Sequence, residues 1–333
     1  MARPAFANDV DLIFTLFALF LQQQPVHPHR GHPFEYHHAT FIVFFTLMQF
    51  RRLTRFKAQH RWLLTHPDWQ QVLGFPGVPH RTTLSRRYKR LYPVLQDFIA
   101  FLGQYAEDVD PAFDSRELYE DKSLFKAQGP VWHQSDRLAG CIPAGLRHLD
   151  TDATWSKSAY HGWVYGYGLH VTNNRIGFPK LVQVETAAVS ESQVLDAKED
   201  PILHVLSPNT LTTDDSYTQA RRIRRWAQAG VVLLTPALKW TQGRYATAYR
   251  RFIREPEQVE LSRSRRTAIE PIFDLVAQLI GATDNHKQLP LQRLAKVRTY
   301  LALATLLLQV AMIANSIWGL PLRNISTIMT AFT

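Results

Sequence analysis

Cysteine is almost missing from this sequence of 333 residues, in which Cys141 is the single example. One cysteine excludes an intramolecular disulfide and a zinc site built from cysteines, and it fits a reducing compartment. The N-terminus also lacks the basic flank and the small-residue cleavage site of a signal peptide, because Asp9 and Asp11 lie where the flank belongs. We therefore expect a cytoplasmic protein.

Acidic residues are outnumbered, with 28 Asp and Glu against 38 Lys and Arg and a formal net charge of +10. The excess is clustered. Residues 51–90 hold ten Lys and Arg and one acid, and residues 221–266 hold twelve Lys and Arg and three acids. Arginine dominates both blocks, and its planar fork grips phosphate oxygens in pairs. Two basic blocks predict two surfaces that face a polyanion, with a generally basic protein as the alternative.

Charged residues are absent from residues 300–320, a stretch long enough to cross a bilayer. Four polar residues interrupt it, namely Thr305, Gln309, Asn315 and Ser316. We therefore predict a buried packing helix and no membrane contact. Attachment to a membrane through this stretch is the alternative.

The first part of the chain has helical patterns between residues 8 and 104, including helices over 12–21 and 40–53. Thr82 to Ser85 has the composition of a helix start. The basic residues that follow resemble those of a helix that docks on DNA. An ordinary solvated basic face is an equal alternative. These residues are Arg86, Arg87, Lys89 and Arg90.

After Pro111 the pattern changes to alternating strands and helices. We expect strands over 118–125, 162–172, 180–186, 211–213 and 231–235, helices over 192–200, 217–228 and 261–280, and an irregular basic segment over 237–260. This order predicts an α/β fold, an RNase H-like mixed sheet flanked by helices, behind an N-terminal helical domain. A sequence of this length has room for both.

Two acidic residues are candidate ligands for a hard divalent cation, because such ions prefer carboxylate oxygens. Asp214 follows the short strand over 211–213, and its alternative role is to cap the next helix, with Asp215 as a competitor. Glu270 lies beside the buried stripe of the last helix, four residues after Arg266. The alternative for Glu270 is a plain surface ion pair with Arg266.

The first carboxylate of such a site belongs on the first strand of this fold. Asp121 lies in the middle of that strand, so we prefer it. Asp150 and Asp152, which precede the strand over 162–172, are the alternatives.

Five segments together resemble transposases of the DDE superfamily from bacterial insertion sequences. They are DKSLFKAQGPVWH (121–133), ATWSKS (153–158), GWVYGYGLH (162–170), DDSY (214–217) and RTAIE (266–270), and the resemblance covers about residues 80–320. The sequence departs from the family at Lys122, where Gly or Ser is usual, at Arg263 in place of Tyr, and at Ala277 in place of Lys.

The resemblance implies a transposase that cleaves DNA and transfers strands by two-metal-ion phosphoryl transfer. Asp121, Asp214 and Glu270 would hold two Mg²⁺ or Mn²⁺ ions. Double-stranded DNA, as element ends and target, would be bound by a homodimer in the bacterial cytoplasm, associated with the nucleoid. The DNA-binding residues would be Arg86, Arg87, Lys89, Arg90, Arg221, Arg222, Arg224, Arg225, Arg263, Arg265 and Arg266.

The expected domains are residues 1–110 for DNA binding, 111–290 for catalysis, including the basic insertion near 237–260, and 291–333 as a C-terminal packing helix and tail. Two other functions stay open: a plain RNase H-like nuclease, and a transposase-derived DNA-binding protein without catalysis, which the unusual Lys122 favours.

Two weaker clusters are present. Five histidines, His27, His29, His32, His37 and His38, offer a metal site of imidazole ligands. Four aromatic residues, Trp155, Trp163, Tyr165 and Tyr167, offer stacking surfaces for unpaired bases, although core positions suit most of them better.

Overall fold

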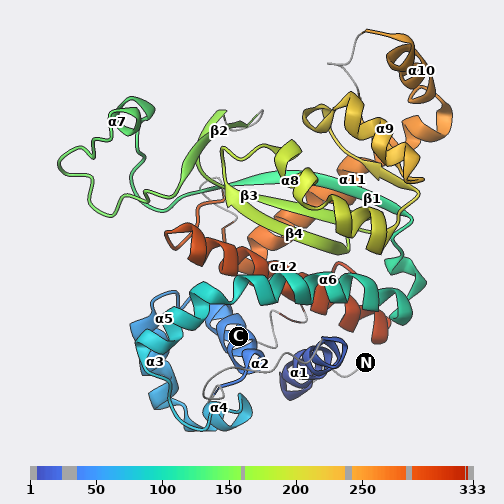
Figure 1. Ribbon diagram of the computed structural model, residues 1–333. Helices are drawn as coiled ribbons and strands as arrows, with labels where there is room; N and C mark the ends of the chain where they lie inside the picture. Colours follow the sequence, from blue (N-terminus) through green and yellow to red (C-terminus); the bar gives the residue numbers. More distant parts are fainter. Residues whose placement is uncertain are drawn as a thin grey trace.

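The computed structural model describes residues 6–24, 36–158, 162–236, 242–282, 287–326 and 328, with the backbone alone for residues 6–10. The long helices α6 (Tyr92–Val109) and α12 (Leu294–Ile317) run together through the middle of the molecule (Figure 1). Helices α1 to α5 lie on one side of this pair, and a mixed sheet lies on the other side. The two basic blocks of the sequence fall at opposite ends of this arrangement.

The N-terminal helices are α1 (Phe6–Gln23), α2 (His38–Phe50), α3 (Phe56–Thr65), α4 (Pro67–Val72), α5 (Arg81–Arg90) and α6 (Tyr92–Val109). Helix α2 is buried from Thr40 to Phe50 and packs through its rings. The Phe45 ring meets that of Tyr88 on α5 edge-on, with centroids 4.8 Å apart. Because Leu84 and Tyr88 are the buried residues of α5, the rest of this helix presents its basic residues outward.

The sheet contains β1 (Glu117–Lys126), β2 (Thr154–Ser158), β3 (Gly162–Asn174), β4 (Pro179–Thr186), β5 (Thr210–Thr212) and β6 (Val232–Leu234). Strand β3 is antiparallel to β1, β2 and β4, whereas β5 is parallel to β1 and β6 is parallel to β5. Since β1 and β4 pair with the same stretch of β3, the sheet reads β4–β3–β1–β5–β6. Three antiparallel strands followed by two parallel ones form the RNase H-like sheet that the sequence predicts.

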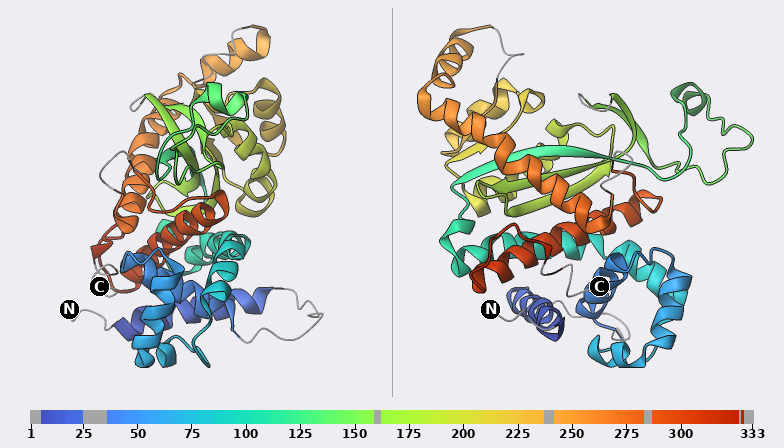
Figure 2. Two further views of the ribbon diagram at one scale, coloured as in Figure 1. Left: turned by 90° about the vertical axis from the view of Figure 1, so that its left-hand side faces the viewer. Right: turned by 180° about the vertical axis from the view of Figure 1, so that it is seen from behind.

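Helices cover both faces of the sheet, and the strand pattern follows from that. One face packs on α8 (Glu191–Ala197), η2 (Pro201–Leu206) and α9 (Ala220–Gln228). The other face packs on α11 (Pro256–Ile280), which crosses in front of the sheet in the right-hand view of Figure 2, seen from behind. Strand β3 is buried from Val164 to Asn174 because it lies between two covered faces.

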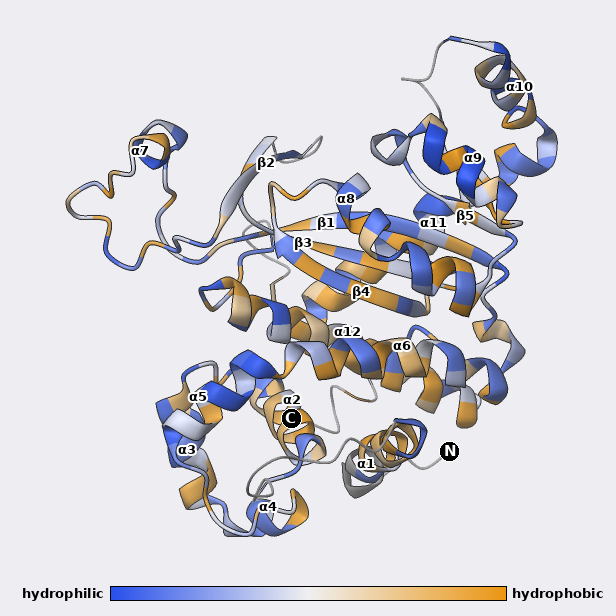
Figure 3. Cartoon of the chain, in the orientation of Figure 1, coloured by the Kyte–Doolittle hydropathy of each residue, from blue (hydrophilic) through white to orange (hydrophobic). Residues whose placement is uncertain are grey.

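Helix α12 (Leu294–Ile317) is long and apolar enough to cross a membrane, and 89% of its most apolar window is buried in the fold. It packs against α6 and β4 in Figure 1, and its apolar residues continue those of α6 and α2 in Figure 3. The predicted buried packing helix is confirmed. One of the polar residues in this stretch, Gln309, is hydrogen-bonded inside the fold, since its amide donates to the carbonyls of Ile99 and Pro179 at 2.9 and 2.8 Å.

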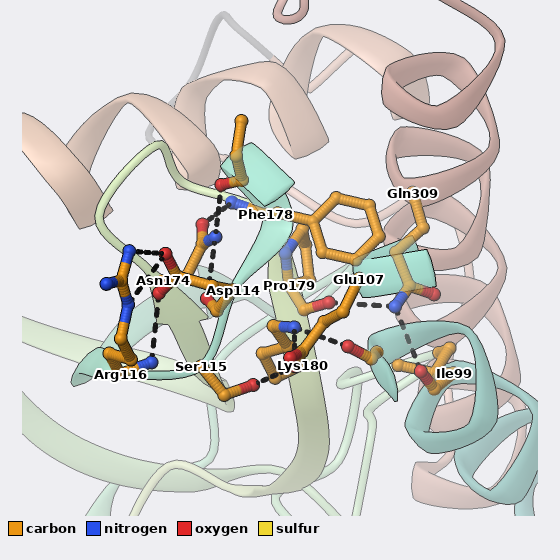
Figure 4. A network of polar contacts seen from close by, with 12 residues as sticks. Ile99, Glu107, Asp114, Ser115, Arg116, Asn174, Phe178, Pro179, Lys180 and Gln309 are labelled. Atoms are coloured by element: carbon orange, nitrogen blue, oxygen red, sulfur yellow. Dashed lines mark hydrogen bonds and ion pairs between the residues drawn. The ribbon is translucent and has the colours of Figure 1, made fainter. Parts of the chain in front are cut away.

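Buried polar contacts join α6, β4 and α12 (Figure 4). The ammonium of Lys180 on β4 lies 2.8 Å from the Glu107 carboxylate and also donates to the carbonyl of Gly103, both on α6. Glu107 in turn accepts a hydrogen bond from Ser115. These contacts satisfy a buried cation and fix the sheet against the long helices.

Three segments differ from the sequence prediction. Residues 237–241 lie outside the described residues, but Arg244–Phe252 form helix α10, and α11 begins at Pro256 rather than at 261. Proline at the first position of a helix costs no hydrogen bond, which favours this earlier start.

The helix expected over 217–228 splits into η3 (Asp215–Tyr217) and α9. Strand β2 was not predicted; a long excursion that carries α7 (Gln134–Leu138) precedes it.

Candidate active site and nucleic-acid interface

The sheet places Asp121 and Asp214 side by side. Strands β1 and β5 are parallel neighbours, and their last paired residues are Tyr119 and Thr212. Two residues further along each chain stand Asp121 and Asp214, at the same edge of the sheet. The Asp214 charge is among the causes that raise the pKa of Asp121, as expected for close neighbours.

Asp121 is a largely buried carboxylate with a cation against it. Its side chain is 20% exposed. Oxygen Oδ1 accepts the backbone N–H of Lys122 at 2.8 Å, and Oδ2 accepts Nη1 of Arg265 at 2.6 Å. Burial raises the pKa of Asp121 to about 6, and the Arg265 charge opposes that shift. An acid of this kind gains much from a second positive charge, because water compensates it poorly.

Asp214 also caps the turn that follows it. Its Oδ1 accepts the backbone N–H of Ser216 at 2.9 Å and the Ser216 hydroxyl at 2.5 Å. The capping role considered from the sequence is therefore real, and it fixes the carboxylate beside β1. One oxygen is enough for the cap, which is compatible with a ligand at the other.

Glu270 does not join these two acids, which corrects the predicted cluster of three carboxylates. Its side chain is 51% exposed and forms an i,i+4 ion pair with Arg266 at 3.7 Å, the alternative considered from the sequence. Ile269, Ile272 and Phe273 face the sheet, and Glu270 lies a third of a turn off that stripe. Within the described residues, no group of three or more His, Cys, Asp or Glu is arranged to hold a metal ion.

Asp150 and Asp152 have structural contacts elsewhere. Oxygen Oδ2 of Asp150, which is fully buried, accepts the Tyr167 hydroxyl at 2.7 Å and the backbone N–H of Arg293 at 3.1 Å. Asp152 accepts the N–H of Leu294 at 3.0 Å. Both acids therefore hold the start of α12, and Asp121 is the first-strand acid that lies beside Asp214.

Lys122, which departs from the family pattern, connects β1 to the loop that follows β4. Its ammonium donates to the carbonyls of Ala187 and Val189 at 3.0 and 3.1 Å and lies 3.4 Å from Glu191. It points to the α8 face, away from Asp121, because neighbours in a strand alternate. Lysine at this position thus ties the loop after β4 to β1 and leaves the acid edge unobstructed.

The predicted DNA-binding residues divide into exposed and structural ones. Arg222 is 0% exposed and contacts Asp196, Ser192 and the Tyr217 carbonyl, so it stabilises the α8–α9 packing and is unavailable to DNA. Arg225 forms an ion pair with Glu199. Arg87 is half-buried over the Phe41 ring, and Arg265 pairs with Asp121. The exposed cations are Arg86, Lys89, Arg90, Arg221, Arg224, Arg225, Arg263 and Arg266, of which Arg225 pairs with Glu199 and Arg266 with Glu270.

Two further cations extend the α5 surface, although they are about 200 residues away in the chain. The Thr299 hydroxyl on α12 donates to the Tyr88 carbonyl at 2.7 Å, which brings Lys296 next to Lys89. Burial lowers the pKa of Lys296, and the charges of Lys89 and Arg293 lower it further. Like charges held this close favour a bound anion. Sequence reasoning missed Lys296 and Arg293 because only the fold brings them to α5.

The weaker clusters have simpler explanations. Tyr165 and Tyr167 are buried core residues, and Trp155 is half-buried. Trp163, at 64% exposed, is the aromatic of this group that stays available for stacking. His27, His29 and His32 lie outside the described residues.

Comparisons with known proteins add little. No protein-family model matches the chain, and no curated protein matches it. Among solved structures, the chain is similar to a pre-cleavage Mos1 transpososome, with 9% sequence identity, 93% of this chain and 98% of that chain covered, and a TM-score of 0.18. A TM-score this low does not relate two folds, so the fold is assigned from the strand order of the sheet.

Proposed function

We propose that this chain is a DDE-type transposase of the insertion-sequence kind, which cleaves and joins DNA by metal-dependent phosphoryl transfer. The observation that carries the proposal is the pair of Asp121 and Asp214 at one edge of an RNase H-like sheet. The family resemblance of the five segments and the exposed arginines of α9 and α11 support it.

The two aspartates fit a hard divalent cation, Mg²⁺ or Mn²⁺. Both offer carboxylate oxygens, the donors such ions prefer, and burial leaves Asp121 poorly compensated. When bound, the metal polarises a phosphoryl oxygen and lowers the pKa of a bound water. Asp121 and Asp214 would hold it. As placed, Glu270 does not share that site, so a second ion would require Glu270 to approach it.

The basic surfaces bind duplex DNA in this proposal. The exposed cations of α5, with Lys296 and Arg293, contact the backbone at one end of the molecule. Arg221 and Arg224 of α9, with Arg263 and Arg266 of α11, contact it at the other end. Phosphate contacts of this kind set register and supply affinity without reading sequence. A homodimer bound to DNA in the bacterial cytoplasm belongs to the same proposal.

A DNA-binding protein without catalysis is the second candidate. The position of Glu270 on the solvent side of α11 and the ion pair between Arg265 and Asp121 favour it. The two candidates share DNA binding and differ in chemistry.

Nicking of supercoiled plasmid separates the two candidates. The transposase proposal expects nicking with Mn²⁺, none with EDTA, and none for Asp214→Asn. The matched control is Asp68→Asn, an exposed acid on α4 far from the pair. A protein that binds DNA with the expected salt dependence but never nicks it would be the second candidate.

A further inference from the structure

Helix α11 is fastened to β1 by two consecutive residues. The Ser264 hydroxyl lies 2.8 Å from the Tyr119 hydroxyl, and Nη1 of Arg265 lies 2.6 Å from Oδ2 of Asp121. Arg265 is 17% exposed, whereas its neighbours Arg263 and Arg266 are exposed to solvent. The one arginine of this run that turns inward therefore ends on the acid that we assign to metal binding.

Arg265 and a divalent cation compete for the same carboxylate. Oδ1 of Asp121 accepts the backbone N–H of Lys122 and Oδ2 accepts Nη1 of Arg265, so a cation placed against Oδ2 meets the guanidinium. A guanidinium stays protonated at all relevant pH values, so it gives up the carboxylate only by moving. Its planar fork also suits a phosphate, which offers it a second partner of the same charge as Asp121.

We propose that Arg265 is a built-in counterion of Asp121, and that a divalent cation at Asp121 and a DNA phosphate at Arg265 replace this ion pair together. The inference rests on the proposed function and deepens it. Before the exchange Asp121 is compensated by Arg265; afterwards Asp121 faces the cation and Arg265 faces the DNA backbone. Neither charge is left buried without a partner, the arrangement that costs most.

The exchange couples the two ligands. Because Arg265 must leave Asp121 for either to bind fully, each ligand weakens the contact that opposes the other. Coupling of this type is reciprocal, and roughly fivefold to a hundredfold is typical. DNA should therefore tighten Mn²⁺ binding, and Mn²⁺ should tighten DNA binding by the same factor.

The test is calorimetric titration of the full chain with Mn²⁺, in the absence and presence of a short duplex. Without DNA, Arg265→Gln should bind Mn²⁺ about tenfold more tightly than wild type, within that coupling range. Arg263→Gln removes the same charge two residues away, from an exposed site, and should stay within about twofold of wild type, because an exposed charge is screened by solvent and salt. In Arg265→Gln the duplex should no longer change the Mn²⁺ affinity by more than about twofold, since the opposing contact is gone.

Two further variants separate the possible failures. Ser264→Ala removes the neighbouring contact between α11 and β1 without removing charge; a gain in Mn²⁺ affinity equal to that of Arg265→Gln would show loosened packing and overturn the exchange. Equal affinities for Arg265→Gln and Arg263→Gln would overturn it too. Asp214→Asn tests the metal site itself. If that variant binds Mn²⁺ like wild type, or if no variant binds Mn²⁺, the proposed function fails and the exchange with it.

Discussion

Two consecutive acids on β1, Glu120 and Asp121, face opposite sides of the sheet and meet opposite conditions. Glu120 is fully buried under α8, with the Lys198 ammonium 2.8 Å from one oxygen and the Thr172 hydroxyl donating to the other. Asp121, 20% exposed, lies against a single arginine and beside Asp214. On the α8 face, a buried lysine balances the charge of Glu120. On the α11 face, the two neighbouring acids Asp121 and Asp214 carry more negative charge than Arg265 balances.

The two acids therefore differ in how far the fold itself balances their charge. Burial lowers the pKa of Lys198, and Glu120 opposes that shift, so the pair is a closed unit. Asp121 keeps a neighbour of the same charge, an arrangement that costs stability unless a ligand offsets it. Substitutions on the two faces should therefore have different consequences.

The largest effect is expected for chemistry on the α11 face. Asp121→Asn and Asp214→Asn should each lower plasmid nicking by about a hundredfold or more, because each removes a metal ligand. Binding of Asp214→Asn to duplex DNA at fixed salt should stay within about threefold, since no phosphate contact is removed, whereas Asp121→Asn frees Arg265 and should bind the duplex more tightly. Both quantities can be measured on the same preparation. Nicking by either variant at the wild-type rate would show that the substituted aspartate is not needed for cleavage, and it would contradict the proposed difference between the α8 and α11 faces.

The next largest effect is expected for stability on the α8 face. Glu120→Gln strands the Lys198 ammonium in the core and should cost about 3–5 kcal/mol of unfolding free energy, measured by urea denaturation. The double variant Glu120→Leu with Lys198→Met should recover most of that loss, because an apolar pair of similar volume needs no compensation. If Glu120→Gln is as stable as wild type, the buried Glu120–Lys198 ion pair does not stabilise the fold.

Arginines on α9 sharpen the comparison further. Arg222→Met should lower stability by about 2–3 kcal/mol, since it leaves Asp196 and two carbonyls without a buried donor. Arg224→Met, on the exposed side of the same helix, should leave stability within about 0.5 kcal/mol and weaken DNA binding. A loss of stability of the same size for both would contradict the division into structural and exposed cations.

A smaller effect is expected at the α5 surface. Lys89→Gln and Lys296→Gln should each reduce the slope of log affinity against log salt by about 1, if each neutralises one phosphate. Asp68→Asn, on nearby α4, serves as a control that should leave the slope unchanged. The measurement is fluorescence anisotropy of a labelled duplex across a salt series. Unchanged slopes would remove this surface from the DNA interface.

The smallest effect is expected for Glu270, if its position in the structure holds with DNA bound. Glu270→Gln breaks an exposed pair with Arg266, worth about 0.3–0.5 kcal/mol in a helix. Its nicking rate should stay within about threefold of wild type, as should that of Asp274→Asn one turn later. A collapse of nicking in Glu270→Gln alone would show that α11 turns Glu270 towards Asp121 and Asp214 during the reaction.

Local patterns predicted most of the fold. Alternation and β-branched residues marked β1, β3 and β4, and their order with the two later strands was enough for the RNase H-like sheet. Strand β2 was missed because it is short and four of its five residues are Thr, Ser or Lys. The extent of α11 was misjudged because its first turn is polar, and such a turn resembles a loop.

The sequence prediction placed Asp121 on the first strand and Asp214 directly after a later one, and the structure makes these two strands parallel neighbours. The side on which Glu270 lies depends on the rotation of α11, which its neighbours Ile269, Ile272 and Phe273 set by packing. Sequence spacing alone left that rotation open. The hydrogen bond of Arg265 to Asp121 joins residues 144 positions apart, and that of Thr299 to Tyr88, which brings Lys296 to α5, joins residues 211 apart; no local pattern reports either.

The central claim is that Asp121 and Asp214 form a metal site, and anomalous diffraction from crystals soaked in Mn²⁺ tests it most directly. The account predicts an anomalous peak between the two carboxylates, and its loss in Asp214→Asn crystals. Density for Mn²⁺ at Glu270 or elsewhere, with nothing at Asp121 and Asp214, would contradict the account.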